Sequence, residues 1–314
     1  MERRKMGKEK GEKTMEEGWG NKGKRGTIEK ESIAIEYLSR SLKESSKKTK
    51  FHYHPRCSKL AITHLCFDYD LLLFARGDLS SVITMQQCFN QFSAASEKRD
   101  TIVQELGLLE DELPFKYLGV TLLTKKLSLV QWQPLIEKIV ARISAWTTKK
   151  LSYGGRVQLV QTVLFGVQAY WAQLFVLPAK VLKTIDAYCR SYVWSGCNTI
   201  SKKALVSWER VFAPKSVGGL GLANLQKWNK AAIAKSFWDL AQKQDKLWIK
   251  WIHAYYIKGQ AIKTMTIPQQ ACWMTRKIME AKTTFEGLHW RFKKGKNITR
   301  QIYVQLIGED TRVP

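Results

Sequence analysis

The sequence predicts an α+β fold in which a small strand-containing part comes first and a mainly helical part follows. Two short runs of strand-forming residues flank an acidic break between residues 59 and 74, and another such run covers residues 116–123. From Trp132 onward the apolar side chains recur at helical spacing instead. With 314 residues, the chain is long enough for one large or two ordinary domains.

Composition indicates a basic globular protein. Lys and Arg total 52 against 27 Asp and Glu, a formal net charge of +25, and hydrophobic residues make up 45% of the chain. These values exclude a collagen-like chain, a wholly disordered chain and a disulfide-stapled miniprotein. The positive charge favours a polyanionic partner, either nucleic acid or an anionic membrane surface. No small-molecule substrate is evident, because no phosphate-binding glycine loop or nucleophile elbow is present.

The N-terminal part combines a tail with a predicted hairpin. Residues 1–30 mix both charge signs with glycine, which predicts a disordered charged tail. Structure should begin near residue 31, where apolar residues follow helical spacing. The runs 59–67 and 71–74 predict two strands with acidic residues at the tip between them. Residues 85–95 predict a helix, and residues 116–123 a strand whose Gly119 lets a backbone or ligand approach.

The second half predicts helices. Apolar residues from Trp132 to Trp146 recur at i, i+3, i+4 and i+7, and Ser152 is a suitable N-cap for a helix that Pro178 ends. Residues 181–193, 225–240 and 246–256 predict three more helices. The uncharged stretch 157–179 resembles a membrane span in length, but its polar residues should share one arc of a water-soluble helix: Gln158, Gln161, Thr162, Gln168 and Gln173. We therefore expect no membrane partner.

Several short motifs, in order along the chain, resemble the pol-type open reading frame of plant LINE-type (non-LTR) retrotransposons. They are Ile35–Arg40, Phe51–Arg56, Ile62–Phe67, Leu71–Phe74, Leu113–Val120 and Leu151–Arg156. The resemblance implies a partial reverse-transcriptase palm at 31–125 and a mainly α-helical thumb and connector at 126–260. Residues 261–314 form a C-terminal segment with no well-defined pattern. The implied ancestral activity is RNA-directed DNA polymerisation with Mg²⁺ as cofactor.

The catalytic motif of that family is altered here. Its Phe-Ala-Asp-Asp hairpin aligns with Phe67, Asp68, Tyr69 and Asp70, so Tyr69 replaces the first aspartate and only Asp70 is retained. A phenol stays neutral at pH 7 and is a poor Mg²⁺ ligand. Asp68 is a displaced carboxylate, because successive side chains of a strand point to opposite faces. Asp70 is thus a weak candidate metal ligand, and we expect no bound Mg²⁺.

Two further departures from the family predict that catalysis is lost. The family's upstream metal-binding aspartate has no counterpart before Ile33, and a lysine-bearing segment near the incoming nucleotide has no secure counterpart after residue 95. We therefore expect a truncated, inactive reverse-transcriptase fragment. Two alternatives stay open: a non-catalytic basic protein that binds nucleic acid, and an unselected relic with no function.

Candidate contacts with RNA or DNA phosphates follow from the same motifs. The resemblance places Lys116, Tyr117 and Gly119 in a primer-grip-like hairpin. Lys149, Lys150 and Arg156 bracket the start of the long helix after residue 152, where basic side chains could meet phosphates or form a solvated edge.

Histidines, cysteines and tryptophans favour ordinary structural roles. The spacing of His52, His54, Cys57, His64 and Cys66 fits no standard zinc pattern. Most of the twelve tryptophans lie on apolar helical stripes, which favours the core over base stacking. The six cysteines include no CxxC pair, and no signal-like segment is present, so we expect a reduced, intracellular protein. The sequence does not distinguish nucleus from cytoplasm.

Overall fold

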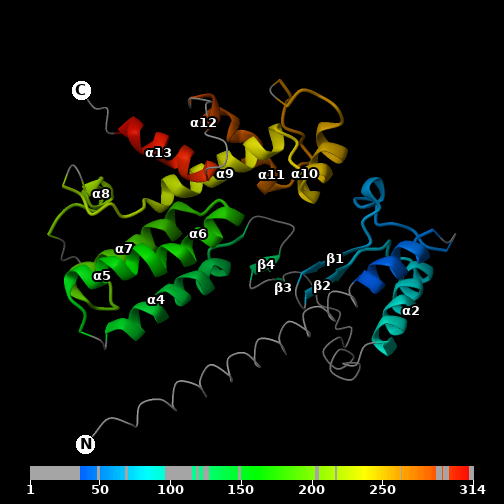
Figure 1. The fold of residues 1–314 in the computed structure, drawn as a ribbon, viewed down its shortest axis with the longest axis horizontal. Helices are drawn as coiled ribbons and strands as arrows, with labels where there is room; N and C mark the ends of the chain where they lie inside the picture. The colour runs from blue at the N-terminus through cyan, green and yellow to red at the C-terminus, as the bar shows by residue number, and fades with distance from the viewer. Residues whose placement is uncertain are drawn as a thin grey trace, which may run out of the picture. The chain divides into compact units, whose positions relative to one another are not determined.

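The computed structural model describes residues 36–47, 50–67, 70–95, 115–117, 120–122, 127–147, 150–201, 205–215, 218–262, 264–287, 292 and 297–310. The predicted tail at 1–30 lies outside these residues. The chain divides into two compact units, unit 1 up to residue 112 with 117–120, and unit 2 comprising 113–116 and 121–314. Each unit is described by itself, and their elements are labelled in Figure 1.

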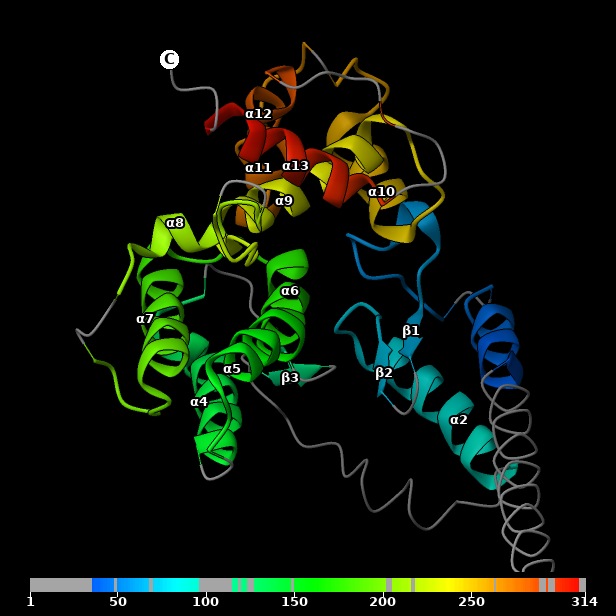
Figure 2. The same cartoon turned by 60° about the vertical axis from the view of Figure 1, so that its left-hand side comes forward.

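Unit 1 contains the predicted hairpin and two helical stretches. Strand β1 (His64–Phe67) pairs antiparallel with β2 (Asp70–Leu73), in the register His64↔Leu73 to Phe67↔Asp70. The strand predicted at 59–67 begins only at His64, because Ser58–Leu60 forms a 3-10 turn that ends at left-handed Ala61. Helix α2 (Leu79–Ala95) lies beside the helical segment 36–45 in Figure 2. Their apolar faces form a small core of Leu38, Leu42, Phe51, Met85 and Cys88.

A second short hairpin replaces the single strand predicted at 116–123. Strands β3 (Phe115–Tyr117) and β4 (Val120–Leu122) pair with each other. Only two residues separate them, a connection that fits antiparallel pairing alone. The sequence pattern missed this turn because its residues are apolar on both sides of Gly119, so nothing interrupts the run.

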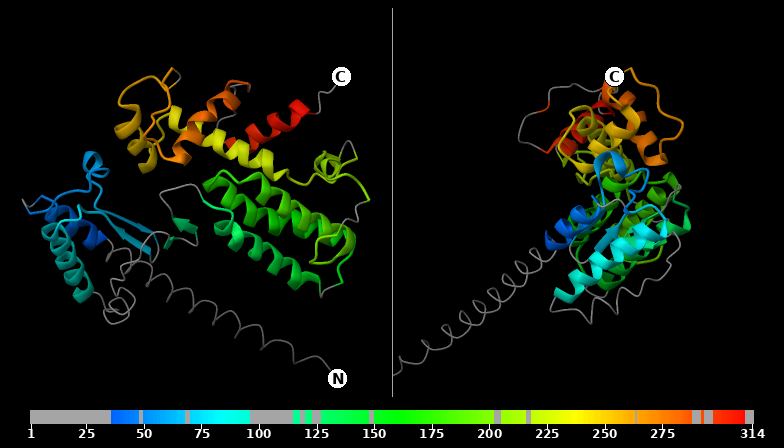
Figure 3. Two further views of the ribbon diagram at one scale, coloured as in Figure 1. Left: turned by 180° about the vertical axis from the view of Figure 1, so that it is seen from behind. Right: turned by 90° about the vertical axis from the view of Figure 1, so that its right-hand side faces the viewer.

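Three helical stretches build the first part of unit 2. The 3-10 turn η2 (Val130–Trp132) leads into α4 (Gln133–Thr147), whose Leu135, Ile139 and Ile143 are buried as the spacing predicted. The run α5 (Tyr153–Leu159), η3 (Val160–Leu164) and α6 (Phe165–Leu174) is continuous, and α7 (Ala179–Ser195) packs against α4 and α5. Figure 3 shows these helices side by side from behind.

The long helical run departs from the predicted pattern in two ways. It ends at Leu174, four residues before Pro178, and Pro178 instead precedes α7. Its middle segment η3 is a π-helix, which accommodates one extra residue and so rotates the following turns relative to an ideal α-helix. The prediction that Gln168 lies on a solvent-facing arc is therefore wrong. Gln168 is buried, and its Nε2 lies 3.6 Å from the Cys189 Sγ.

The remaining helices form a second core in unit 2. After the short α8 (Trp208–Phe212), helix α9 (Leu225–Ala241) packs against α6, α11 (Trp273–Glu280), α12 (Lys282–Glu286) and α13 (Ile298–Asp310). Helix α10 (Leu247–Ile252) continues into a π-helical turn, η5 (His253–Ile257). Helices α11 to α13 lie within residues 261–314, where the sequence pattern had defined no element. Figure 1 shows α13 lying across α9.

A buried amide fixes the turn between α6 and α7. Asn229 of α9 accepts the backbone N–H of Leu177 at 2.9 Å and donates to the carbonyl oxygens of Ala172 at 2.7 Å and Phe175 at 2.6 Å. These three bonds satisfy backbone groups that the end of α6 leaves unpaired. The turn that sets the direction of α7 is therefore held by one side chain from a helix more than fifty residues away.

Candidate nucleic-acid interface

The β1–β2 hairpin contains the residues that the resemblance matches to a catalytic motif. The pair Phe67↔Asp70 closes the ladder, so Asp70 begins β2 and Asp68 and Tyr69 fall between the strands, outside the described residues. Leu71 of the same strand packs against the small core of unit 1. The backbone of Asp70 is thus anchored by its neighbour, as the predicted hairpin requires.

Two histidines near this hairpin have separate local partners. The His52 Nδ1 lies 3.4 Å from a carboxylate oxygen of Asp78, and the His54 Nδ1 accepts the backbone N–H of Arg56 at 3.2 Å. Hydrogen bonds from Ser80 and Ser81 hold the pKa of the Asp78 carboxyl well below its usual range. No group of three or more His, Cys, Asp or Glu within the part of the chain that the structure describes could hold a metal ion.

The predicted primer-grip residues lie on the β3–β4 hairpin. Lys116 and Tyr117 belong to β3, and Gly119 lies between the strands, outside the described residues. The division between the two units passes through this hairpin, with Lys116 in unit 2 and Tyr117 in unit 1.

Lys150 and Arg156 lie on either side of the start of α5. Lys150 is exposed and has a left-handed backbone, with a φ of 42°, between α4 and α5. Ser152 caps α5 as predicted, its hydroxyl accepting the Gly155 N–H at 3.3 Å. Arg156 belongs to the first turn of α5, and Lys149 lies outside the described residues. That these basic residues contact phosphates stays a prediction.

The Arg156 guanidinium sits against the end of α7. A Cβ on Gly196, the left-handed C-cap of α7, would lie 2.7 Å from the Arg156 Nη1. Among the described residues Arg156 forms no ion pair, and its Nε is buried without a hydrogen-bond partner. A half-buried cation that no described carboxylate pairs with leaves positive potential at this edge.

Aromatic residues surround this cation. Tyr153 stacks on Trp194 with ring centroids 5.4 Å apart, and Tyr192 packs against Trp146 at 5.8 Å. Burial raises the pKa of the Tyr153 and Tyr192 hydroxyls, and the positive charge of Arg156 partly offsets that rise. Sequence reasoning had not assigned these tyrosines to the basic edge. The motif Leu151–Arg156 contained Tyr153, whereas Tyr192 lies 36 positions after Arg156 and carried no such signal.

A partly buried acidic residue on α7 lies at a separate polar site. Asp186 contributes to a small cavity of about 20 Å³ that Gln168, Cys189 and Trp208 also line, a volume suited to one water molecule. Burial raises the pKa of Asp186 to about 6, against the opposing effects of the Trp208 indole N–H and of Arg190. Burial also raises the pKa of the Cys189 thiol to about 12, so this sulfur stays protonated and unreactive.

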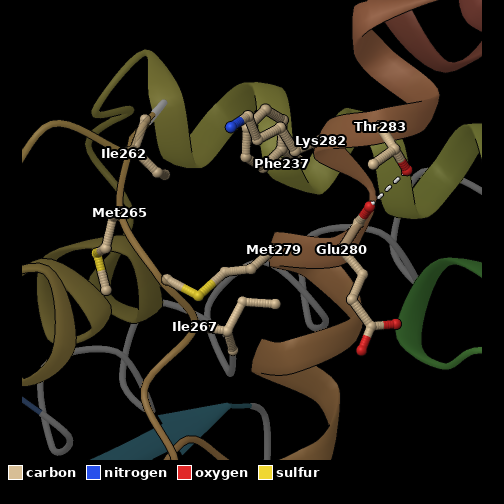
Figure 4. Close-up of a pocket in the computed structure, with 8 residues that line it drawn as sticks. All are labelled: Phe237, Ile262, Met265, Ile267, Met279, Glu280, Lys282 and Thr283. Atoms are coloured by element: carbon tan, nitrogen blue, oxygen red, sulfur yellow. Dashed lines mark hydrogen bonds between the residues drawn. The ribbon is translucent and has the colours of Figure 1, made fainter.

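The apolar cavity in Figure 4 lacks converging polar groups. Its volume is about 350 Å³, and Phe237, Ile262, Met265, Ile267 and Met279 supply its apolar lining. At its edge the Thr283 hydroxyl donates to the backbone oxygen of Glu280, and the Glu280 carboxylate pairs with Lys277. The polar groups at this edge thus bond to each other, and the cavity offers no constellation for chemistry.

The six cysteines are free thiols, and four of them are at least partly buried. None of the described helices combines the length and the apolar character that crossing a bilayer requires.

Comparison with known proteins gives one informative similarity. No protein-family profile matches the chain. A putative ribonuclease H protein from Arabidopsis thaliana is 28% identical over 151 residues. The matched region makes up 48% of this chain but 24% of that protein, so the chain spans about a quarter of its relative's length.

Proposed function

We propose that this chain is a palm-and-thumb part of a LINE-type reverse transcriptase that binds RNA or DNA through phosphate contacts and does not polymerise. Three observations support the descent: the ordered motifs, the β1–β2 hairpin at the altered Asp pair, and the helices that follow it. The putative ribonuclease H protein, whose name denotes an enzyme acting on nucleic acid, supports the same partner class.

The proposal that this chain binds RNA or DNA rests on Arg156. Cations in protein interiors are ordinarily paired, because an unpaired charge loses solvation. Among the described residues Arg156 forms no ion pair, and the exposed Lys150 precedes Tyr153 by three residues in the chain. A phosphate at this edge would supply the missing anion to both side chains.

The proposal that this chain does not polymerise rests on residues 67–70. Nucleotidyl transfer by two Mg²⁺ ions requires carboxylate ligands that hold the metals roughly 3.5–4 Å apart. In the β1–β2 pair Asp70 lies directly opposite Phe67, and Tyr69 precedes Asp70 in the chain. The phenol of Tyr69 is a neutral, weak ligand, and the carboxylate of Asp68 is one position away from the required one. These residues therefore do not fit a two-metal centre.

A salt titration tests binding. Filter binding of the whole chain to a short DNA or RNA duplex should show affinity falling steeply with salt, because each phosphate contact releases condensed counterions. Lys150→Gln and Arg156→Gln should each reduce the slope of log K against log salt by about 0.9. Lys243→Gln is a matched control, since Lys243 is also exposed and left-handed, and should leave the slope unchanged.

Two results would contradict the proposal. Absence of binding at low salt, or affinity that does not change with salt, would remove the nucleic-acid role. Templated synthesis in a primer-extension assay with Mg²⁺ or Mn²⁺ would show that Asp68 or Asp70 still supports catalysis.

A further inference from the structure

One aromatic ring at the basic edge of unit 2 keeps a large part of its surface accessible. Tyr153 stacks on Trp194 with 22° between the ring planes, and 38% of the tyrosine surface is exposed. Trp194 covers one face of the Tyr153 ring, so the accessible surface belongs to the remainder of the ring. Exposed aromatic faces in a positively charged groove are the surfaces on which unpaired bases stack.

Tyr153 and the cation share one side of α5. Residues three apart on a helix are neighbours, so the Tyr153 ring and the Arg156 side chain lie on the same face. The positive charge of Arg156 acts to lower the pKa of the Tyr153 hydroxyl, as expected if the two side chains are close. Lys150, three residues before Tyr153 in the chain, is an exposed second cation.

Three buried hydrogen-bond donors at this edge have no acceptor among the described residues. They are the Tyr192 hydroxyl, the Trp194 Nε1 and the Arg156 Nε. Tyr192 is only 1% exposed, so its hydroxyl is out of contact with bulk solvent. Buried donors are ordinarily paired, so the Tyr192 and Trp194 donors add to the positive potential of Arg156, which forms no ion pair among the described residues.

We propose that the edge formed by Lys150, Tyr153, Arg156 and Trp194 binds an unpaired nucleotide of single-stranded RNA or DNA. The base stacks on the open surface of Tyr153, and its phosphate lies beside Arg156 and Lys150. This inference rests on the proposed nucleic-acid binding and narrows it, because a duplex keeps its bases stacked internally and can use only the two cations.

Fluorescence anisotropy with labelled 12-nucleotide oligo(dT), oligo(rU) and a 12-base-pair duplex tests the inference. Tyr153→Leu should weaken single-strand binding by roughly 5- to 100-fold, the usual contribution of base stacking on an aromatic side chain, and change duplex binding less than twofold. Tyr153→Phe keeps the ring and should restore single-strand affinity. Tyr170→Leu is the matched control, because Tyr170 is another exposed tyrosine, 45% accessible on α6, and should change neither affinity. Circular dichroism verifies that each variant folds.

The outcomes distinguish base stacking from the phosphate binding on which it rests. Equal losses on single strands and duplex, or no loss with Tyr153→Leu, would overturn base stacking while leaving phosphate binding in place. Arg156→Gln should weaken binding of all three probes. Failure of the unaltered protein to bind any probe would overturn both proposals.

Discussion

Asp186 offers the sharpest test of the packing in unit 2. Its carboxyl is largely buried between α7 and the short α8, beside Trp208, Arg190 and Glu209. Burial raises its pKa from the ordinary 3.8 to about 6, and the negative charge of Glu209 acts in the same direction. The substitution Asp186→Asn replaces the carboxylate with a neutral group of nearly the same shape.

The expected magnitude follows from that pKa difference. A difference of about two pH units, at 1.36 kcal/mol for each, means that ionised Asp186 destabilises the fold by about 3 kcal/mol relative to its protonated form. Because the folded-state pKa is raised, the stabilising contribution is complete below pH 3.8 and is lost as the pH rises through about 6. Asn should therefore stabilise the protein at pH 7.5 and have little effect near pH 4.

Thermal unfolding of both proteins between pH 4 and pH 8 measures the difference. For a unit of this size, each kcal/mol shifts Tm by about 2–4 °C, so Asp186→Asn should unfold roughly 6–12 °C higher at pH 7.5. Asp245→Asn is the control: Asp245 is 87% exposed and pairs with Lys250 at 2.6 Å, which lowers its pKa, so any effect has the opposite sign. A difference that is the same at pH 4 and pH 7.5, or a less stable Asp186→Asn at pH 7.5, would refute the reasoning.

Three other substitutions test named contacts. Gly196→Ala should destabilise unit 2 by roughly 1–2 kcal/mol in denaturant unfolding, because its φ is 73° and the new methyl would meet Arg156, and adding Arg156→Ala should recover the steric part. Asn229→Ala should lower the free energy of unfolding by about 2–4 kcal/mol, because two backbone carbonyls and one backbone N–H lose their partner. The control Gln226→Ala, at an exposed position of the same helix, should change it by less than about 0.5 kcal/mol. Tyr192→Phe should leave the free energy of unfolding unchanged or raise it, because its buried hydroxyl has no partner to lose, and a clear loss in a urea titration would show that a partner exists.

Local patterns predicted the helices well and their interruptions poorly. The spacing of Leu135, Ile139 and Ile143 follows one face of α4, and all three are buried. The hairpin was predictable for a similar reason, since two strand-forming runs flank a polar break. The π-helical η3 leaves no comparable signal, because a single extra residue in an apolar stretch changes no composition.

The candidate interface likewise combines residues that are close in sequence with residues that only the fold brings together. Lys150, Tyr153 and Arg156 lie within seven residues, so the sequence could bring them to one helix start. Gly196 and Tyr192 join them only because α7 packs against α4 and α5, and that packing depends on the turn that Asn229 holds. Contacts between residues this far apart follow from the whole fold, which no local pattern specifies.

The two π-helical turns mark points where the chain can lose one residue without disturbing the packing that follows. Because η3 already holds one residue more than an α-helical turn, removing one residue between Val160 and Leu164 would let the run close into an ordinary α-helix while the turns after it keep their orientation. Trp171 would then stay buried against Trp132. A gap in the α-helical turns would instead rotate everything after it by about 100° about the helix axis. Related chains should therefore carry single-residue gaps within this segment more readily than in the turns on either side.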